Sequence, residues 1–317
     1  MATVTKPLVT IGISTYNRAD GYLRPALESA LAQTYPNLEI VVSDNASTDA
    51  TSTYVESFND PRLRFFRQEK NLGANGNFNF CLDQAKGAYF LLLHDDDILD
   101  PDFIEACMNA VGDDTSVGVV RTGVRVIDGK GNVVYEKANR MHGKTTTELF
   151  IDWFNKGTPI YYCSTLFNTE HLRAAGGLRT RTNVFDDVIS LAKLSARHGH
   201  ADVLEPKTNF RIHGSNRGSD DLLKAWAEDS LYLLEVLREE LPQDAELLTK
   251  EGQPYLCMRC YRYASLLPTA KERWQAYLWA YRLFGYSYSP LSYLTRQRYL
   301  DLKSAARTVI KGQPAPA

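Results

Sequence analysis

Three consecutive aspartates, Asp95, Asp96 and Asp97, follow His94 at the end of an apolar run in this chain of 317 residues. The run, residues 89–93, has the length and character of a strand that is buried on both faces of a parallel sheet. Ligands of open α/β sheets bind beyond the carboxyl ends of such strands. Because adjacent carboxylates repel one another, three of them at a strand end favour the arrival of a cation. Mg²⁺ and Mn²⁺ prefer such hard oxygen ligands, so the run predicts a metal site or, alternatively, a solvated acidic turn.

The first half of the chain alternates short apolar runs with amphipathic stretches, which predicts βαβ units and a mostly parallel sheet. The expected strands are residues 8–14, 38–43, 63–67 and 88–93. The expected helices are residues 22–33, 51–58, 75–85 and 102–111. Polar residues follow the four strands, at 15–18, 44–45, 71–73 and 94–97. These strand ends should meet in one crevice of a Rossmann-like nucleotide-binding half.

The second half has a mixed pattern of strands and helices. The expected strands are residues 117–127, 133–135 and 161–167, with the hairpin signal DGKGN between the first two. A helix should start at residue 168 or 169, and another should cover residues 187–198. From about residue 218 the chain reads as helical, without further strands.

These elements predict an α/β fold with a helical extension. Residues 1–217 should form one domain, with a nucleotide-binding half at about 7–115 and an acceptor half at 116–217, and residues 218–317 a helical C-terminal region. The chain has neither GxGxxG nor GxxxxGK[ST], which argues against a nicotinamide dehydrogenase and a P-loop enzyme.

The composition is that of a globular protein, with 44% hydrophobic and 23% charged residues. No apolar run approaches the roughly 18 residues of a membrane span, and the N-terminus lacks the features of a signal peptide. Five scattered cysteines are unlike a secreted disulfide framework, and the pair Cys257 and Cys260 reads as one helix face. We therefore expect a cytoplasmic protein.

The charge is distributed unevenly along the chain. Residues 252–317 hold ten lysines and arginines and only two acids, a net charge of +8, whereas residues 1–251 carry −10. The basic stretch also contains twelve aromatic residues, and Trp274, Tyr277, Leu278 and Tyr281 follow helical spacing. This spacing favours packing or an oligomer interface. The charge favours contact with anionic lipid or a lipid-linked diphosphate acceptor. No nucleic-acid-binding module accompanies it, so we expect no nucleic acid partner.

Three segments together resemble the family 2 glycosyltransferases. They read TIGISTYNR at residues 10–18, VVSDNASTD at 41–49 and HDDD at 94–97, and the resemblance extends over about residues 7–215. It implies a GT-A fold and transfer of a sugar from a nucleotide diphosphate, usually with inversion. A divalent cation, Mn²⁺ or Mg²⁺, is the implied cofactor.

The resemblance also implies which residues bind the nucleotide sugar. Arg18 can neutralise a diphosphate through charge-assisted hydrogen bonds, although residues 17–20 also read as a helix-capping turn. Asp44 resembles the aspartate that accepts the N3–H of uracil or thymine, and Gly73 lets the backbone approach the nucleotide. The implied set is Thr15, Tyr16, Arg18, Asp44, Asn71, Gly73 and Asp95, with Asp95 contacting the ribose or the metal.

The metal ligands are implied by the same comparison. His94 replaces the first aspartate of the family's DxD motif, which leaves Asp96 as the principal ligand and Asp97 as its support. His213, in RIHGSN at residues 211–216, can complete the metal shell or contact the diphosphate. A solvated histidine in a turn is the alternative.

The pair Asp186 and Asp187 stands where the family has Glu-Asp at a helix start, and the second acid there is the catalytic base. The chemistry agrees, because an inverting transfer needs a carboxylate to take the proton of the acceptor hydroxyl. From the residues alone the pair would be an ordinary helix N-terminus.

The sequence therefore predicts a metal-dependent inverting glycosyltransferase that uses a UDP- or dTDP-sugar and a saccharide or lipid-linked acceptor, in polysaccharide or glycolipid synthesis. Its place would be the cytoplasm or the inner face of the plasma membrane. A sugar-nucleotide pyrophosphorylase is one alternative, but the expected Gly-rich loop with a nearby lysine is absent from residues 11–18. A catalytically silent nucleotide-sugar-binding module is another, supported by His94.

Overall fold

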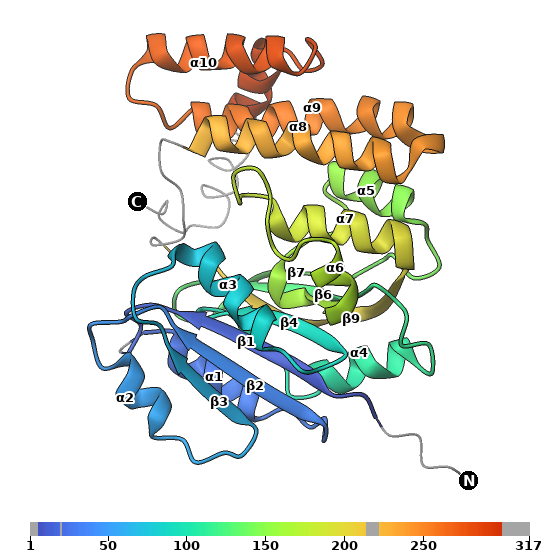
Figure 1. Cartoon of the computed structure of the whole chain (residues 1–317). Coiled ribbons are helices and arrows are strands. Elements are labelled where there is room, and N and C mark those ends of the chain that lie inside the picture. Colours follow the sequence, from blue (N-terminus) through green and yellow to red (C-terminus); the bar gives the residue numbers. More distant parts are fainter. Residues whose placement is uncertain (1–5, 20, 214–221, 300–317) are drawn as a thin grey trace, which may run out of the picture.

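The computed structural model describes residues 6–19, 21–213 and 222–299 (Figure 1). Gly214, Ser215 and Asn216 of the RIHGSN segment lie outside the described residues, and so do the expected domain boundary at residue 217 and the chain end after residue 299.

Four parallel strands build the N-terminal half of a nine-stranded sheet. They are β1 (Val9–Thr15), β2 (Leu38–Asp44), β3 (Leu63–Arg67) and β4 (Tyr89–His94). The helices that follow them are α1 (Leu23–Leu31), α2 (Thr51–Glu56), α3 (Gly73–Gln84) and α4 (Phe103–Val111). The predicted α/β alternation is confirmed, with strand boundaries within one residue of those expected.

The other half of the sheet is mixed, as predicted. Its strands are β5 (Ile98–Leu99), β6 (Val119–Ile127), β7 (Val133–Lys137), β8 (Thr165–Asn168) and β9 (His200–Arg211). The strand order is β3-β2-β1-β4-β8-β6-β9-β5, and β7 pairs with β6 in the expected hairpin. β8 runs antiparallel to β4 and β6, whereas β9 runs parallel to β6. The sequence did not reveal β5 or β9, because β5 is very short and β9 is rich in half-exposed polar residues.

The predicted strand at residues 161–167 is wrong in its first half. Residues Tyr162–Ser164 form a 3₁₀ turn, η1, and only β8 that follows is extended. The hydroxyls of Ser164 and Thr165 donate to the carbonyl of Tyr161, at 3.2 and 2.9 Å, which stabilises the turn.

The remaining helices cover the mixed half and extend beyond it. They are α5 (Thr146–Phe154), α6 (Thr169–Ala174), α7 (Asp186–His198), α8 (Leu222–Glu240), the short 3₁₀ turn η2 (Pro242–Asp244), α9 (Ala245–Ala264) and α10 (Ala270–Leu283). α5 was not expected, although Thr145 and Glu148 form a capping box at its start. Among the described helices, none has the length and apolar character that a membrane span requires.

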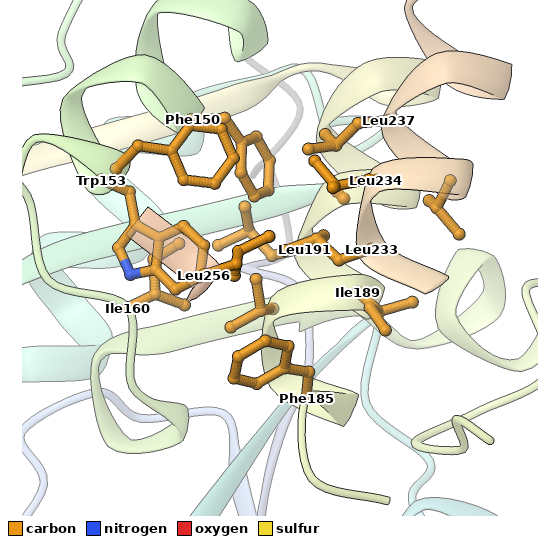
Figure 2. Packing of buried hydrophobic residues seen from close by; sticks show 14 of the residues in the cluster. Phe150, Trp153, Ile160, Phe185, Ile189, Leu191, Leu233, Leu234, Leu237 and Leu256 are labelled. Carbon is orange, nitrogen blue, oxygen red and sulfur yellow. The ribbon is translucent and has the colours of Figure 1, made fainter. Parts of the chain in front are cut away.

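Hydrophobic residues fill both faces of the sheet, and β4 contributes to each. Tyr89, Leu91 and Leu93 belong to the cluster under α1 and α4, while Phe90 and Leu92 belong to the cluster on the opposite face. The second cluster continues through α5 and α7 into α8 and α9 (Figures 1 and 2). The helices after residue 221 therefore share a core with the sheet.

Shortening Leu256 tests this shared core. Leu256 on α9 is fully buried, whereas Leu266, just after the same helix, is 60% exposed. Leu256→Ala should lower the free energy of unfolding by about 2–5 kcal/mol, and Leu266→Ala should change it little. Urea unfolding followed by both circular dichroism and tryptophan fluorescence measures the effect. If Leu256→Ala creates a separate early transition and leaves the main one unchanged, the shared core is refuted.

Candidate active site

The carboxyl ends of β1, β2 and β4 lie level with one another. Thr15 of β1 is paired with Asp44 of β2, and Ser14 is paired with His94 of β4. The polar residues that follow these strands are therefore neighbours, as the sequence predicted.

The loops after β1 and β2 are held together by hydrogen bonds. The backbone N–H groups of Asn17 and Arg18 donate to the hydroxyls of Ser47 and Thr51, at 2.8 and 2.9 Å. The backbone N–H of Ala19 donates to Asp49 at 3.1 Å. The two loops form one surface, on which Thr15 is buried and Tyr16 is 44% exposed.

Asp44 lies beneath this surface. Its side chain is buried, and its two oxygens accept hydrogen bonds from the Ser47 N–H at 2.9 Å and the Ser52 hydroxyl at 2.5 Å. The guanidinium of Arg67 lies 3.9 Å away. Asp44 thus shapes the loop after β2, and its contact with a nucleotide base stays a prediction.

The loop after β3 is attached to the same surface. The Asn45 amide donates to the Asn71 side chain at 2.9 Å and accepts from the Leu72 N–H at 2.7 Å. Gly73 begins α3 with a φ of 73°, which a side chain would disfavour. Asn71 and Gly73 therefore lie beside the loop that follows β2.

Asp95 faces the loop after β1. Its carboxylate lies 3.7 Å from the guanidinium of Arg18. Burial raises the pKa of Asp95 to about 6, against the opposing effects of Thr15 and Arg18. Arg18 and Asp95 are thus brought together with Tyr16 at the carboxyl ends of β1 and β4.

His94, Asp96 and Asp97 form a group of possible metal ligands, each with one ligand atom within 4.8 Å of the others. Burial, and next the charge of Asp96, raises the pKa of Asp97, and a cation would offset this repulsion. Asp97 also accepts from the Arg211 N–H at 2.9 Å, which fixes the acidic loop to β9. Two carboxylates and an imidazole fit a divalent cation. In the sequence, His94 departs from the DxD motif of the family because it replaces the first aspartate. In the structure, His94 belongs to the group of possible metal ligands.

His213 lies at the same place. Its Nε2 is 2.9 Å from a carboxylate oxygen of Asp96, and its ring lies 4.8 Å from that of Tyr22. Arg211, which the sequence reasoning did not assign, supports the arrangement: its Nε donates to the Asp96 carbonyl at 2.8 Å. The histidine and Asp96 are neighbours, as their proposed metal role requires.

A group of aromatic and amide side chains joins the acidic loop to the start of α7. The His94 ring stacks on Phe78 at 5.2 Å and lies 5.3 Å from the ring of Tyr162. Burial, and then the charges of Asp186 and Asp187, raises the pKa of Tyr162. No sequence signal points to Tyr162, whose position depends on the 3₁₀ turn.

Asp186 is buried at the first position of α7. The amide of Asn75, from α3, donates a hydrogen bond to its carboxylate. Burial raises the pKa of Asp186 to about 6. Sequence reasoning missed Asn75, although the asparagine-rich stretch NLGANGNFN at residues 71–79 contains it.

Asp187 lines a cavity of about 380 Å³ between the mixed half of the sheet and helices α8 and α9. Burial, followed by the charge of Asp186, raises the pKa of Asp187 to about 7, and Arg259 of α9 opposes the shift. A carboxyl group with this pKa can accept a proton near neutral pH. The C-terminal helices, which lay outside the resemblance, therefore contribute to the candidate site.

Comparisons with known proteins show the family and the fold of the chain. Residues 10–174, just over half of the chain, match the family model of glycosyl transferase family 2. An uncharacterized glycosyltransferase of Rickettsia felis is 30% identical over 258 residues, which cover 79% of this chain and 41% of that protein. The succinoglycan biosynthesis protein ExoO of Rhizobium meliloti is 31% identical over 65% of this chain and 61% of its own length. Chondroitin synthase of Escherichia coli is 38% identical over 40% of this chain and 19% of its own length. The chain thus spans about two fifths or less of the first curated relatives that it matches.

Solved structures share the fold at low sequence identity. TarS residues 1–349 from S. aureus, in complex with UDP-GlcNAc, superposes with a TM-score of 0.58 at 15% identity, over 88% of this chain and 91% of that one. The mannosyltransferase PcManGT from Pyrobaculum calidifontis, in complex with GDP-Man and Mn²⁺, gives a TM-score of 0.55 at 21% identity, over 96% and 81%. Because the family model matches just over half of the chain and the fold is GT-A, the chain belongs to glycosyl transferase family 2.

Proposed function

We propose that the protein is a metal-dependent inverting glycosyltransferase that moves a sugar from a UDP- or dTDP-sugar to an acceptor hydroxyl. The observation that carries this proposal is the chain of contacts from the crevice to the base: His94 lies against Tyr162, and Tyr162 lies beside Asp186 and Asp187. A donor in the crevice and an acceptor in the cavity would meet there. The similarity to ExoO and chondroitin synthase supports a role in polysaccharide or glycolipid synthesis.

The donor side comprises the loops after β1, β2 and β3. Tyr16 is exposed for contact with the nucleotide, and Arg18 supplies a positive charge for the diphosphate. Asp44, whose buried carboxylate already accepts hydrogen bonds from Ser47 and Ser52, shapes the loop after β2, and its role toward the base rests on the resemblance to the family. Thr15, Asn71, Gly73 and Asp95 complete the proposed donor set.

A divalent cation, Mn²⁺ or Mg²⁺, would be held by Asp96 with His94, Asp97 and His213. When bound, it supplies positive charge that stabilises the leaving diphosphate. Arg211 keeps Asp96 and Asp97 in position because it donates hydrogen bonds to the Asp96 carbonyl and the Asp97 carboxylate.

Asp187 acts as the base. It takes the proton of the acceptor hydroxyl while that oxygen forms a bond to the anomeric carbon, and the bond from this carbon to the diphosphate breaks on the opposite face. Inversion follows from this geometry. Asp186, held by Asn75, fixes the start of α7 and so positions its neighbour.

The exposed face of α10 supports the proposal of peripheral contact with the inner face of a membrane. Tyr277 is buried against Tyr261 and Tyr293, so it packs in the core. Trp274 and Trp279 remain exposed on a helix rich in cations, a composition that suits an anionic lipid surface.

Asp187→Asn tests the base. Transfer should fall by about 10²–10⁴-fold because amides do not take the proton, while donor binding stays unchanged. In the wild type, transfer should rise with pH through about 7 as Asp187 ionises. Rates are measured with a sugar acceptor, and donor affinity by calorimetry. Near-normal turnover in the variant would refute the assignment.

The same substitution should increase stability at high pH. Folding raises the pKa of Asp187 from 3.8 to about 7, so the folded state holds a proton that the unfolded chain has lost between these values. Wild-type stability therefore decreases as pH rises through this window, and Asp187→Asn removes the loss. The free energy of unfolding of the variant minus that of the wild type should be larger at pH 8 than at pH 4.5 by about 1 kcal/mol or more. Urea unfolding at both pH values measures it, and an equal difference between variant and wild type at the two values would contradict the pKa shift.

Asp96→Ala tests the metal site. It should weaken Mn²⁺-dependent donor binding by tenfold or more and leave metal-free binding nearly unchanged, because a principal ligand is lost. Calorimetry with and without Mn²⁺ measures both values, and Asp113→Ala, at an exposed position away from the acidic loop, is the control.

A thermal-shift screen of nucleotide diphosphates and their sugars ranks the bases and sugars that the donor can carry. If the wild type exchanges pyrophosphate with a nucleoside triphosphate but transfers no sugar, it is a pyrophosphorylase.

A further inference from the structure

The cavity beside Asp187 has an unusual combination of residues. Its walls come from β7, the segment after α5, the start of α7, and helices α8 and α9. The aromatic members are Tyr135, Trp153, Tyr161, Phe185, Trp226 and Tyr255. The cationic members are Lys137, Lys156, Arg259 and Arg262, and Asp187 is the only acid among the lining residues.

Asp187 is the one acid that shares the cavity with the four cations, and only the charge of Arg259 acts on its pKa. In the ranges that the structure describes, no carboxylate forms an ion pair with any of them. Burial lowers the pKa of Lys156, and the positive charges of Arg296, Arg259, Arg262 and Lys137 lower it further. Like charges held this close destabilise one another, so the group favours the arrival of an anion.

Aromatic rings fix the most buried of these cations. The Arg259 guanidinium lies 4.6 Å from the ring centre of Trp226 and donates a hydrogen bond to the Tyr255 hydroxyl at 3.0 Å. Phe185 packs edge-on against Trp226 at 4.6 Å, and Trp153 packs against Tyr255 at 4.9 Å. Trp153 and Phe185 belong to the hydrophobic cluster in Figure 2, so the wall of the cavity is continuous with the core. The positive charge is therefore held in place before a ligand binds.

We propose that this cavity binds an acceptor that carries a phosphate group close to its reacting hydroxyl. The inference rests on the proposed function, because Asp187 must receive the proton of that hydroxyl. The phosphate lies among Arg259, Arg262 and Lys156, and the sugar ring lies against the aromatic wall. A single carboxylate would balance one of four cations, whereas a diphosphate or a row of phosphodiesters balances several.

The acceptor's phosphate takes no part in the bond changes. The acceptor oxygen joins the anomeric carbon, its proton passes to Asp187, and the nucleoside diphosphate leaves. The phosphate contributes binding free energy and places the hydroxyl. Removing cations from the cavity should therefore raise KM for the acceptor and leave kcat almost unchanged.

The test compares matched acceptors and two variants. The probes are a sugar 1-phosphate, a sugar linked to a short prenyl diphosphate and a glycerol-phosphate oligomer, each against its phosphate-free counterpart, with the donor found by thermal shift. Lys156→Gln and Arg262→Gln change exposed side chains at the cavity, and Lys86→Gln changes an exposed lysine between α3 and β4, away from it. We expect each cavity variant to raise KM for phosphate-bearing acceptors by about tenfold, which corresponds to the loss of one charged hydrogen bond. Lys86→Gln should have no effect.

The outcomes separate this proposal from the one on which it rests. If the wild type binds the donor and transfers or hydrolyses its sugar, but uses phosphate-bearing and neutral acceptors equally well, the phosphate site is refuted and the glycosyltransferase stands. Unchanged KM in both cavity variants also refutes it. Absence of donor binding and turnover refutes the proposed function itself. Among phosphate-bearing probes, a preference for the prenyl diphosphate indicates a lipid-linked source, and a preference for the oligomer indicates a polymer.

Discussion

The burial of several carboxyl groups, from the loop after β4 to the start of α7, is the constraint on which the rest of this structure depends. Burial raises the pKa values of Asp95, Asp97, Asp186 and Asp187, which means that their ionised forms are destabilised in the folded protein. The fold offsets part of this cost with donors brought from distant segments. Arg18, Asn75 and the backbone of Arg211 each approach one of these carboxylates.

The two ends of the site are held by different parts of the core. The acidic loop follows β4, whose side chains fill both faces of the sheet. Asp187 begins α7, which packs in one cluster with α5, α8 and α9 (Figure 2). The distance between the base and the crevice is therefore set by how the C-terminal helices pack on the sheet, and a change in that packing would alter the site.

In the folded protein, acids of the N-terminal half and arginines of the basic C-terminal stretch lie at two different places in the candidate site. Three acids of the N-terminal half, Asp95, Asp96 and Asp97, lie together after β4, where the proposed function would bind a cation and a diphosphate. Two arginines of the basic C-terminal stretch, Arg259 and Arg262, line the cavity on the far side of the base. The acidic crevice would need a cation before it binds an anionic diphosphate, whereas the basic cavity could bind an anion directly.

The parallel half of the sheet and the order of its strand ends could be predicted from the amino-acid sequence alone. Hydrophobic runs such as that of β4 are local signals, and the carboxyl ends of parallel strands must meet at one edge, so residues 15–18, 44–45, 71–73 and 94–97 could be placed together. Only the tertiary structure revealed β9, the turn at Tyr162, the bond from Asn75 to Asp186, and the position of Arg259 beside Asp187. These depend on contacts between residues far apart in the chain, for which neither periodicity nor composition gives a signal. The burial of Asp44 belongs with them, because the hydrogen bonds that cover its carboxylate come from the folded loop.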